Sequence, residues 1–189
     1  MTTTNMRIDS QDPAQYCANY CEENIWRLGS RLAPRTAWVL IIANFQQGVA
    51  IWRQRSAPHA PDPIVWDYHV VLAAASAGGW DCLDFDTRLP CPVPLDTYLS
   101  ASFPAQDRVP RAYHPLFKCI PLPRYLREFG SDRSHMRASG AWLSPPPRWP
   151  AIGSHHTLPA MIDMRNRQHG QVFDLAQLRR FFLSHDAVA

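Results

Sequence analysis

The sequence predicts a single domain of mixed helix and strand, of the α/β (α+β) class. Amphipathic helical patterns lie near both ends of the chain, and apolar runs typical of strands lie between them. With 189 residues, 46% of them hydrophobic, the chain is long enough to bury one continuous core and too apolar to be disordered. We therefore expect residues 1–189 to form one domain, with residues 1–12 as a flexible amino terminus.

Charge and hydropathy argue against two classes of partner. The 19 basic and 16 acidic residues leave a net charge of +3 without a run of lysine or arginine, so we expect no nucleic-acid ligand. No apolar run approaches the roughly 18 residues of a membrane span, and the amino terminus lacks the apolar segment of a signal peptide. We expect no membrane contact.

The cysteines are odd in number and scattered, which is not the pattern of a disulfide framework. They are Cys17, Cys21, Cys82, Cys91 and Cys119. Reduced thiols fit this usage better, so we expect a cytoplasmic protein. We also expect a monomer.

The first predicted helix is marked by Ile25, Leu28 and Leu32, which are spaced about one turn apart. Two glutamates in the first turn favour a helix amino terminus here, and residues 33–35 break the pattern.

Cys21 lies at the predicted start of this helix. If the helix begins near Asn19 or Tyr20, the thiol lies among unpaired backbone N–H groups, where the helix dipole favours the thiolate. A free cysteine on a helix is more often a small buried hydrophobe, so its position alone does not identify a nucleophile.

Three segments with strand character follow. Residues 36–44 form a dense apolar run typical of a central strand, and residues 49–53 predict a second strand. After a proline-rich loop, the even-numbered members of residues 64–72 are all apolar, whereas the odd-numbered face carries Asp67 and His69.

Residues 80–87 predict the next strand, in which Cys82, Asp84 and Asp86 share one face. A turn at residues 76–79 would join it to the preceding strand as a β-hairpin.

The register of this hairpin decides whether His69 and Asp84 meet. A register centred between residues 76 and 77 places the two directly opposite each other. If residues 78 and 79 form the loop instead, Ala73 faces Asp84 and His69 lies roughly 13 Å away along the strand. We predict the first register.

The second half of the chain alternates short elements with long loops. The predicted elements are a helix at 95–102, a strand at 116–122, a helical turn at 124–129, a strand at 171–173 and an amphipathic helix capped by Asp174. Residues 131–159 form a long irregular stretch, and such loops in a compact domain are usually functional or disordered.

Cys21, His69 and Asp84 supply the parts of a Cys-His-Asp triad. The imidazole would take the thiol proton and later protonate the leaving group, while the carboxylate would fix its tautomer and stabilise the imidazolium. Such a triad suits acyl transfer at an amide. Eight histidines make chance triplets common, so the order alone is weak support.

Four segments contain long, unusual sequence motifs. They are residues 20–26 (Tyr-Cys-Glu-Glu-Asn-Ile-Trp), 65–71 (Val-Trp-Asp-Tyr-His-Val-Val), 84–87 (Asp-Phe-Asp-Thr) and 131–136 (Ser-Asp-Arg-Ser-His-Met). Prolines at 145–147 and the segment 170–175 continue the same order. Together these motifs resemble those of the protein N-terminal glutamine amidohydrolase family.

The resemblance implies an α-β-α sandwich with a mainly antiparallel central sheet, related to the transglutaminase and papain-like group. It assigns the nucleophile to Cys21, the base to His69 and the orienting carboxylate to Asp84. The implied substrate is a protein or peptide with an amino-terminal glutamine, deamidated to glutamate with release of ammonia through a thioester, as in an N-degron pathway. The implied reaction needs no metal or organic cofactor.

Groups that bind the substrate amine are harder to assign. Its α-ammonium requires a carboxylate or several carbonyls, and the candidates are Glu22, Asp67 and Asp132, although such acids are more often solvated or structural. The loop at 131–136, including Ser134, is either a cover over the peptide end or a hydrogen-bonded brace.

Other interpretations stay open. A transglutaminase or a cysteine protease would share the triad, and a binding module would recognise an amino-terminal residue without turnover. A zinc site of Cys17, Cys21, His155 and His156 has poor ligand spacing. Cys17 could be mistaken for the nucleophile, but the Glu-Glu-Asn motif that carries the resemblance follows Cys21 and not Cys17.

Overall fold

The structure is a computed structural model that describes residues 12, 14–32, 36–59, 61–104 and 106–185. The predicted flexible amino terminus, except for residue 12, and the predicted break at 33–35 lie outside the described residues.

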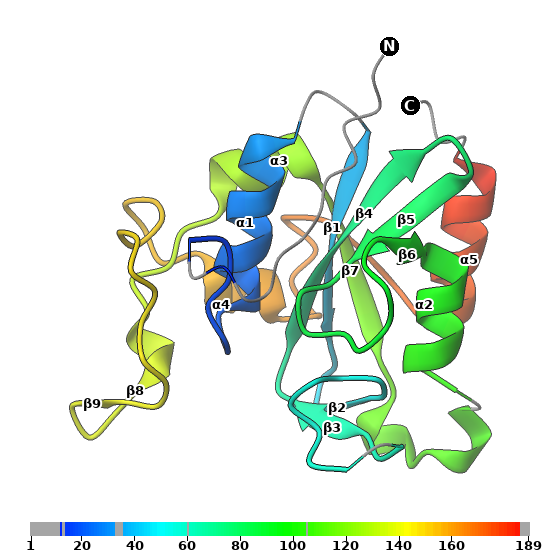
Figure 1. Ribbon diagram of the computed structural model, residues 1–189, viewed down its shortest axis with the longest axis horizontal. Coiled ribbons are helices and arrows are strands. Elements are labelled where there is room, and N and C mark those ends of the chain that lie inside the picture. The colour runs from blue at the N-terminus through cyan, green and yellow to red at the C-terminus, as the bar shows by residue number, and fades with distance from the viewer. Residues whose placement is uncertain (1–11, 13, 33–35, 60, 105, 186–189) are drawn as a thin grey trace.

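A six-stranded antiparallel sheet forms the centre of the fold (Figure 1). Its strand order is β10-β7-β1-β4-β5-β6. The strands are β1 (Ala37–Ala43), β4 (His69–Ser76), β5 (Gly79–Leu83), β6 (Val93–Pro94), β7 (Leu116–Pro121) and β10 (Gln171–Phe173). Two small sheets pair β2 (Val49–Ile51) with β3 (Ile64–Trp66), and β8 (Arg137–Ala138) with β9 (Ala141–Trp142).

Helices cover both faces of the sheet (Figure 1). One face carries α1 (Cys21–Arg31), α3 (Leu122–Glu128) and α4 (Leu158–Ile162), and the other carries α2 (Leu95–Ser102) and α5 (Leu175–Ser184). Short 3-10 helices are η1 (Gln106–Arg108), η2 (Arg111–Tyr113) and η3 (Ser134–Met136). The predicted mixed α/β class with a mainly antiparallel sheet is confirmed.

The apolar character of β1 follows from its burial on both faces. Val39 and Ile41 pack in the core beneath α1, whereas Leu40 and Ile42 pack in the core beneath α2 and α5. A strand buried on both sides reads as a continuous apolar run, as residues 36–44 do.

The predicted strand at 64–72 is wrong in one respect, because two strands occupy it. β3 pairs with β2 in a small sheet, and β4 pairs with β1 in the large one. Between them Asp67 Oδ1 accepts a hydrogen bond from the Tyr68 N–H at 2.8 Å. Alternation of apolar residues continues through this break, so the pattern did not reveal it.

The carboxyl-terminal elements agree with the sequence. α2 and β10 have the predicted bounds, and Asp174 caps α5 in a capping box with Gln177. The irregular stretch at 131–159 contains η3, β8, β9 and the start of α4. Of the helices in the described part of the chain, none has the length and apolar character to cross a membrane.

Candidate active site

Cys21 is the first residue of α1, as predicted. The chain enters the helix through Asn19, whose φ is 66°, and the N-cap Tyr20. The side-chain amide of Asn24 holds this entry, because it donates to the Cys17 carbonyl and accepts from the Cys17 N–H, both at 2.9 Å. The Cys21 N–H therefore belongs to the first turn, where backbone donors lack helical partners.

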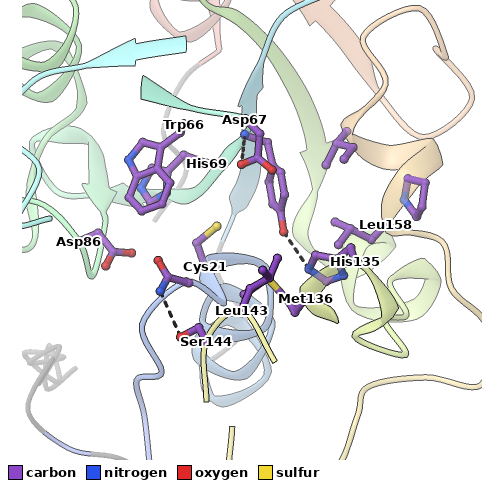
Figure 2. A pocket seen from close by; sticks show the side chains of 14 residues that line it. Cys21, Trp66, Asp67, His69, Asp86, His135, Met136, Leu143, Ser144 and Leu158 are labelled. Atoms are coloured by element: carbon purple, nitrogen blue, oxygen red, sulfur yellow. Dashed lines mark hydrogen bonds between the residues drawn. The ribbon is translucent and has the colours of Figure 1, made fainter. Parts of the chain in front are cut away.

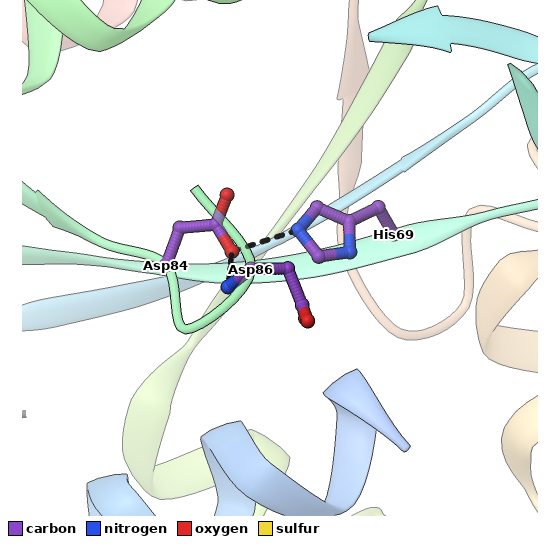
Figure 3. A group of neighbouring side chains, drawn as sticks. All are labelled: His69, Asp84 and Asp86. Atoms are coloured by element: carbon purple, nitrogen blue, oxygen red, sulfur yellow. Dashed lines mark hydrogen bonds and ion pairs between the residues drawn. The ribbon is translucent and has the colours of Figure 1, made fainter. Parts of the chain in front are cut away.

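His69 begins β4 and contacts Asp84, just beyond the end of β5 (Figure 3). His69 Nε2 lies 2.9 Å from Asp84 Oδ1, and both side chains are buried. Burial disfavours the imidazolium, but the Asp84 carboxylate outweighs this effect and raises the pKa of His69. Burial also disfavours the carboxylate, but His69 and other hydrogen-bond donors lower the pKa of Asp84. Nδ1 is the ring nitrogen that remains for a thiol.

Two further side chains hold Asp84. Gln54 Nε2 and Tyr98 Oη donate to Asp84 Oδ2 at 3.1 and 3.0 Å, and the Asp86 N–H donates to Oδ1 at 2.9 Å. Tyr98 lies on α2, so this bond connects the carboxylate to the layer on the opposite face of the sheet. Gln54 and Tyr98 were not predicted from the sequence, since no local pattern marks a contact between separate elements.

The predicted register of the β4–β5 hairpin is wrong. Ser76 pairs with Gly79 and Leu72 with Leu83, so the loop consists of residues 77 and 78. This register is two residues away from the predicted one. His69 and Asp84 still meet, because β5 ends at Leu83 and the chain then turns toward the start of β4.

The prediction that the helix start favours the Cys21 thiolate is wrong for the resting site. Burial raises the pKa of the thiol well above its ordinary value, and the nearby carboxylates of Glu22 and Asp86 raise it further. The backbone N–H of Val70 acts in the opposite direction but does not outweigh them. A protonated thiol needs a base before it can attack.

Cys21 and His69 line the same pocket, which has a volume of about 400 Å³ (Figure 2). The Trp66 ring stacks on the His69 imidazole, with ring centroids 5.9 Å apart and planes at 15°. Asp67 and Asp86 add two acidic groups to the lining. The lining also includes the apolar side chains of Met136, Leu143, Leu158 and Ile162. The pocket thus offers a thiol, an imidazole and carboxylates beside an apolar wall.

Glu22 is fully buried and follows Cys21 directly in the chain. Its Oε2 accepts a hydrogen bond from Tyr68 Oη at 3.1 Å and lies 3.6 Å from Cys21 Sγ. Its Oε1 lies 3.6 Å from His135 Nε2 but has no hydrogen-bond partner. Glu22 itself is not among the pocket-lining residues, but Tyr68, His135 and Cys21, whose side chains it approaches, all line the pocket.

The other three predicted substrate-binding residues lie in two places. Asp67 lines the pocket. Asp132 is exposed and pairs with His156, whose ring stacks on that of His135. Ser134 donates its backbone N–H to Asp132 at 2.9 Å, and neither Asp132 nor Ser134 is among the pocket-lining residues.

A buried ion pair ties the 131–149 segment to α1. Arg133 donates from Nε and Nη2 to the two carboxylate oxygens of Glu23, at 2.8 and 2.7 Å. Trp149 Nε1 donates to the same carboxylate at 2.7 Å, and Arg133 Nη2 donates to the Trp149 carbonyl. The segment is therefore braced against the helix that carries Cys21.

His69, Asp84 and Asp86 are the one group in the described residues that could hold a metal ion, with one ligand atom of each within 4.8 Å of the others. His69 and Asp84 already bond to each other there. The zinc ligand set considered from the sequence, Cys17 and Cys21 with two histidines, is not such a group within the described residues.

Comparisons with known proteins agree with the family resemblance of the sequence motifs. A family model described as N-terminal glutamine amidase matches residues 16–182. The protein N-terminal glutamine amidohydrolase of Bos taurus is 39% identical over 150 residues, covering 75% of this chain and 72% of the relative. That of Danio rerio is 37% identical over 179 residues, covering 88% of each chain.

The matched region contains Cys21, His69 and Asp84, together with the elements that bring the histidine and the aspartate together. It also contains all six strands of the central sheet. The chain therefore belongs to the N-terminal glutamine amidase family.

Proposed function

We propose that this chain hydrolyses the side-chain carboxamide of an amino-terminal glutamine, with Cys21, His69 and Asp84 as its triad. One observation carries the proposal: in a member of this family, His69, which is bonded to the buried Asp84, lines the same pocket as a cysteine at the first position of a helix.

The chemistry proceeds in two halves. His69 Nδ1 takes the proton of Cys21 as the sulfur attacks the carboxamide carbon, and Asp84 stabilises the imidazolium. The imidazolium then protonates the amide nitrogen, the carbon–nitrogen bond breaks, and ammonia leaves a thioester. His69 next takes a proton from water, whose oxygen attacks the thioester carbon, and the thiol is released with a glutamate side chain. The Cys21 N–H is our candidate donor to the oxyanion.

The substrate amine selects the amino terminus. We place the α-ammonium near Asp67, which lines the pocket, and within the field of the buried Glu22 carboxylate. Asp132 and Ser134 act from the 131–136 loop, through the His156 and His135 rings. An internal glutamine has no ammonium to offer these acids, so we expect it to be excluded.

The setting follows from this chemistry. Substrates are proteins and peptides with amino-terminal glutamine, and conversion to glutamate suits an early step of an N-degron pathway. All five cysteines are free, which fits the reducing cytoplasm. The proposed steps draw on no cofactor, nucleic acid or membrane, and one chain supplies all three triad members, so a monomer suffices.

Ammonia release tests the proposal. A peptide with amino-terminal glutamine is compared with its N-acetylated form and with a peptide whose glutamine is internal. We expect release from the first alone and none from Cys21→Ala. Cys17→Ala is the matched control, because Cys17 lies four residues before Cys21, outside α1, and is not among the pocket-lining residues. Equal release by Cys21→Ala would overturn the assignment of the nucleophile, and cleavage of the peptide chain would indicate a protease instead.

A further inference from the structure

Asp86 is a buried carboxylate in the pocket that the triad does not use. It is only 4% exposed, yet it belongs to the pocket lining. Oδ1 accepts a hydrogen bond from Tyr16 Oη at 2.5 Å. Asp86 was predicted to share a strand face with Asp84, but no role was predicted for it.

The two aspartates serve His69 differently. Asp84 bonds to Nε2, whereas Figure 3 shows the Asp86 carboxylate turned away from Asp84. In Figure 2 the Asp86 carboxylate is directed toward the part of the pocket that holds Cys21. Asp86 is also close enough to Cys21 to affect its thiol electrostatically. One atom each of His69, Asp84 and Asp86 lies within 4.8 Å of the others.

The proposed reaction places a nitrogen in this space. When Cys21 Sγ attacks the carboxamide carbon, the amide nitrogen must come within hydrogen-bond distance of His69 to receive its proton. A ring nitrogen of His69 and a carboxylate oxygen of Asp86 lie within 4.8 Å of each other, so an atom that is about 2.9 Å from both the imidazole and the Asp86 carboxylate fits between them. A carboxamide nitrogen carries two N–H donors, and a carboxylate can only accept.

We propose that Asp86 determines specificity for the carboxamide by accepting a hydrogen bond from its nitrogen and repelling a carboxylate at the same position. This inference rests on the proposed function. The same contact that holds the glutamine side chain works against the product, because glutamate brings a negative charge to the place that the departing ammonia vacates. Asp86 thus favours binding of substrate and release of product.

Charge on the neighbours is consistent with this role. Burial raises the pKa of Asp86 and the Asp84 charge adds to the effect, while positive charge on His69 acts against both. The imidazolium that forms during attack therefore favours the anionic form of Asp86 at the moment when the nitrogen must be held.

Binding to the Cys21→Ala variant measures this discrimination without turnover. The two probes are short peptides of the same sequence that begin with glutamine or with glutamate. We expect the glutamine peptide to bind at least about tenfold more tightly, since like charges placed close together are costly. Adding Asp86→Asn should reduce the preference by about tenfold or more, chiefly through tighter binding of the glutamate peptide. Adding Tyr16→Phe instead removes a partner of Asp86 but leaves its charge, so the preference should persist.

Other outcomes overturn the proposal. Equal weakening of both peptides by Asp86→Asn would make Asp86 a ligand of the α-ammonium, and an unchanged preference would leave it a structural residue. If Asp86→Asn does not fold, a third peptide on Cys21→Ala decides the question: one that begins with the γ-methyl ester of glutamate, which is neutral and has no N–H donor. We expect it to bind at least about tenfold more weakly than the glutamine peptide, and equal binding would refute the proposed contact.

The failure of each proposal is distinguishable. Absence of ammonia release by the unaltered chain overturns the proposed function and this inference with it. Ammonia release without the expected preference on Cys21→Ala overturns the inference alone.

Discussion

Replacing Arg133 with methionine should destabilise the fold severely, because it leaves the buried carboxylate of Glu23 without its positively charged partner. Glu23 has no exposed surface, and the Arg133 side chain is 9% exposed. Three hydrogen bonds reach the Glu23 carboxylate, two from Arg133 and one from Trp149. Arg133→Met removes two of them and the compensating positive charge. Breaking one side of a buried ion pair costs about 3–5 kcal/mol, a large share of the roughly 5–15 kcal/mol that stabilises a typical domain.

The assay is urea denaturation at pH 7, followed by tryptophan fluorescence and by circular dichroism. A second variant separates the cost of an unpaired buried charge from the cost of lost packing. The double variant Glu23→Gln/Arg133→Met keeps an acceptor for Trp149 but has no unpaired buried charge. Its free energy of unfolding should therefore be roughly 2 kcal/mol higher than that of Arg133→Met alone. A loss below about 1 kcal/mol in the single variant would refute the reasoning, as would a double variant that is no more stable than the single one.

Three further predictions concern the site and its support. Tyr98→Phe removes one of the four hydrogen bonds to Asp84 and should lower kcat/KM about tenfold with little change in KM, since such a bond to a charged group contributes about 1.5–3 kcal/mol; unaltered steady-state kinetics would contradict this. Asp84 raises the pKa of His69 against the opposing effect of burial. This contribution to stability is fully present below the unfolded pKa of about 6.5 and is lost as pH rises through the raised folded value. The difference in unfolding free energy between the unaltered chain and His69→Gln should therefore shrink as pH rises above about 6.5, and a constant difference in urea titrations would count against it. Lys118 is buried, and its Nζ donates to three carbonyls at the end of α4. Lys118→Met should cost about 2–4 kcal/mol and raise KM more than it lowers kcat, because α4 lines the pocket; equal effects on the two constants would argue against a role in shaping its wall.

Helices could be predicted from the sequence where residues close together in the chain determine them. The helix beginning at Cys21 follows from the spacing of Ile25 and Leu28 and from the acidic first turn, and both apolar residues are buried as expected. Asp174 was predicted to cap the last helix, since a capping aspartate acts on the residues that directly follow it. These signals involve residues within one or two turns of each other.

The hairpin register could not be determined in the same way. A two-residue loop at 77–78, a loop at 78–79 and a turn centred at 76–77 all agree with small residues there. Hydrophobic alternation does not distinguish registers that differ by two residues, because such a shift keeps every side chain on its original face. The meeting of His69 and Asp84 depends on where β5 ends, and the packing of the whole sheet decides that.

Contacts between the layers of the fold also could not be predicted from the sequence. The bond from Tyr98 on α2 to Asp84 joins opposite sides of the sheet, and the pairing of Glu23 with Arg133 spans 110 positions. Neither contact has a periodic signature, so both required the fold.

The tip of the β4–β5 hairpin gives protein engineers a place to open the chain. β4 runs from His69 to Ser76, so the strand ends about 23 Å from His69, and the loop at residues 77–78 lies just beyond that end. A Cβ added at Gly78 would meet nothing within 4 Å. A small fluorescent domain or an affinity tag inserted between Ala77 and Gly78 can therefore report on the protein in a cell while its chemistry, at the opposite end of the strand, continues undisturbed.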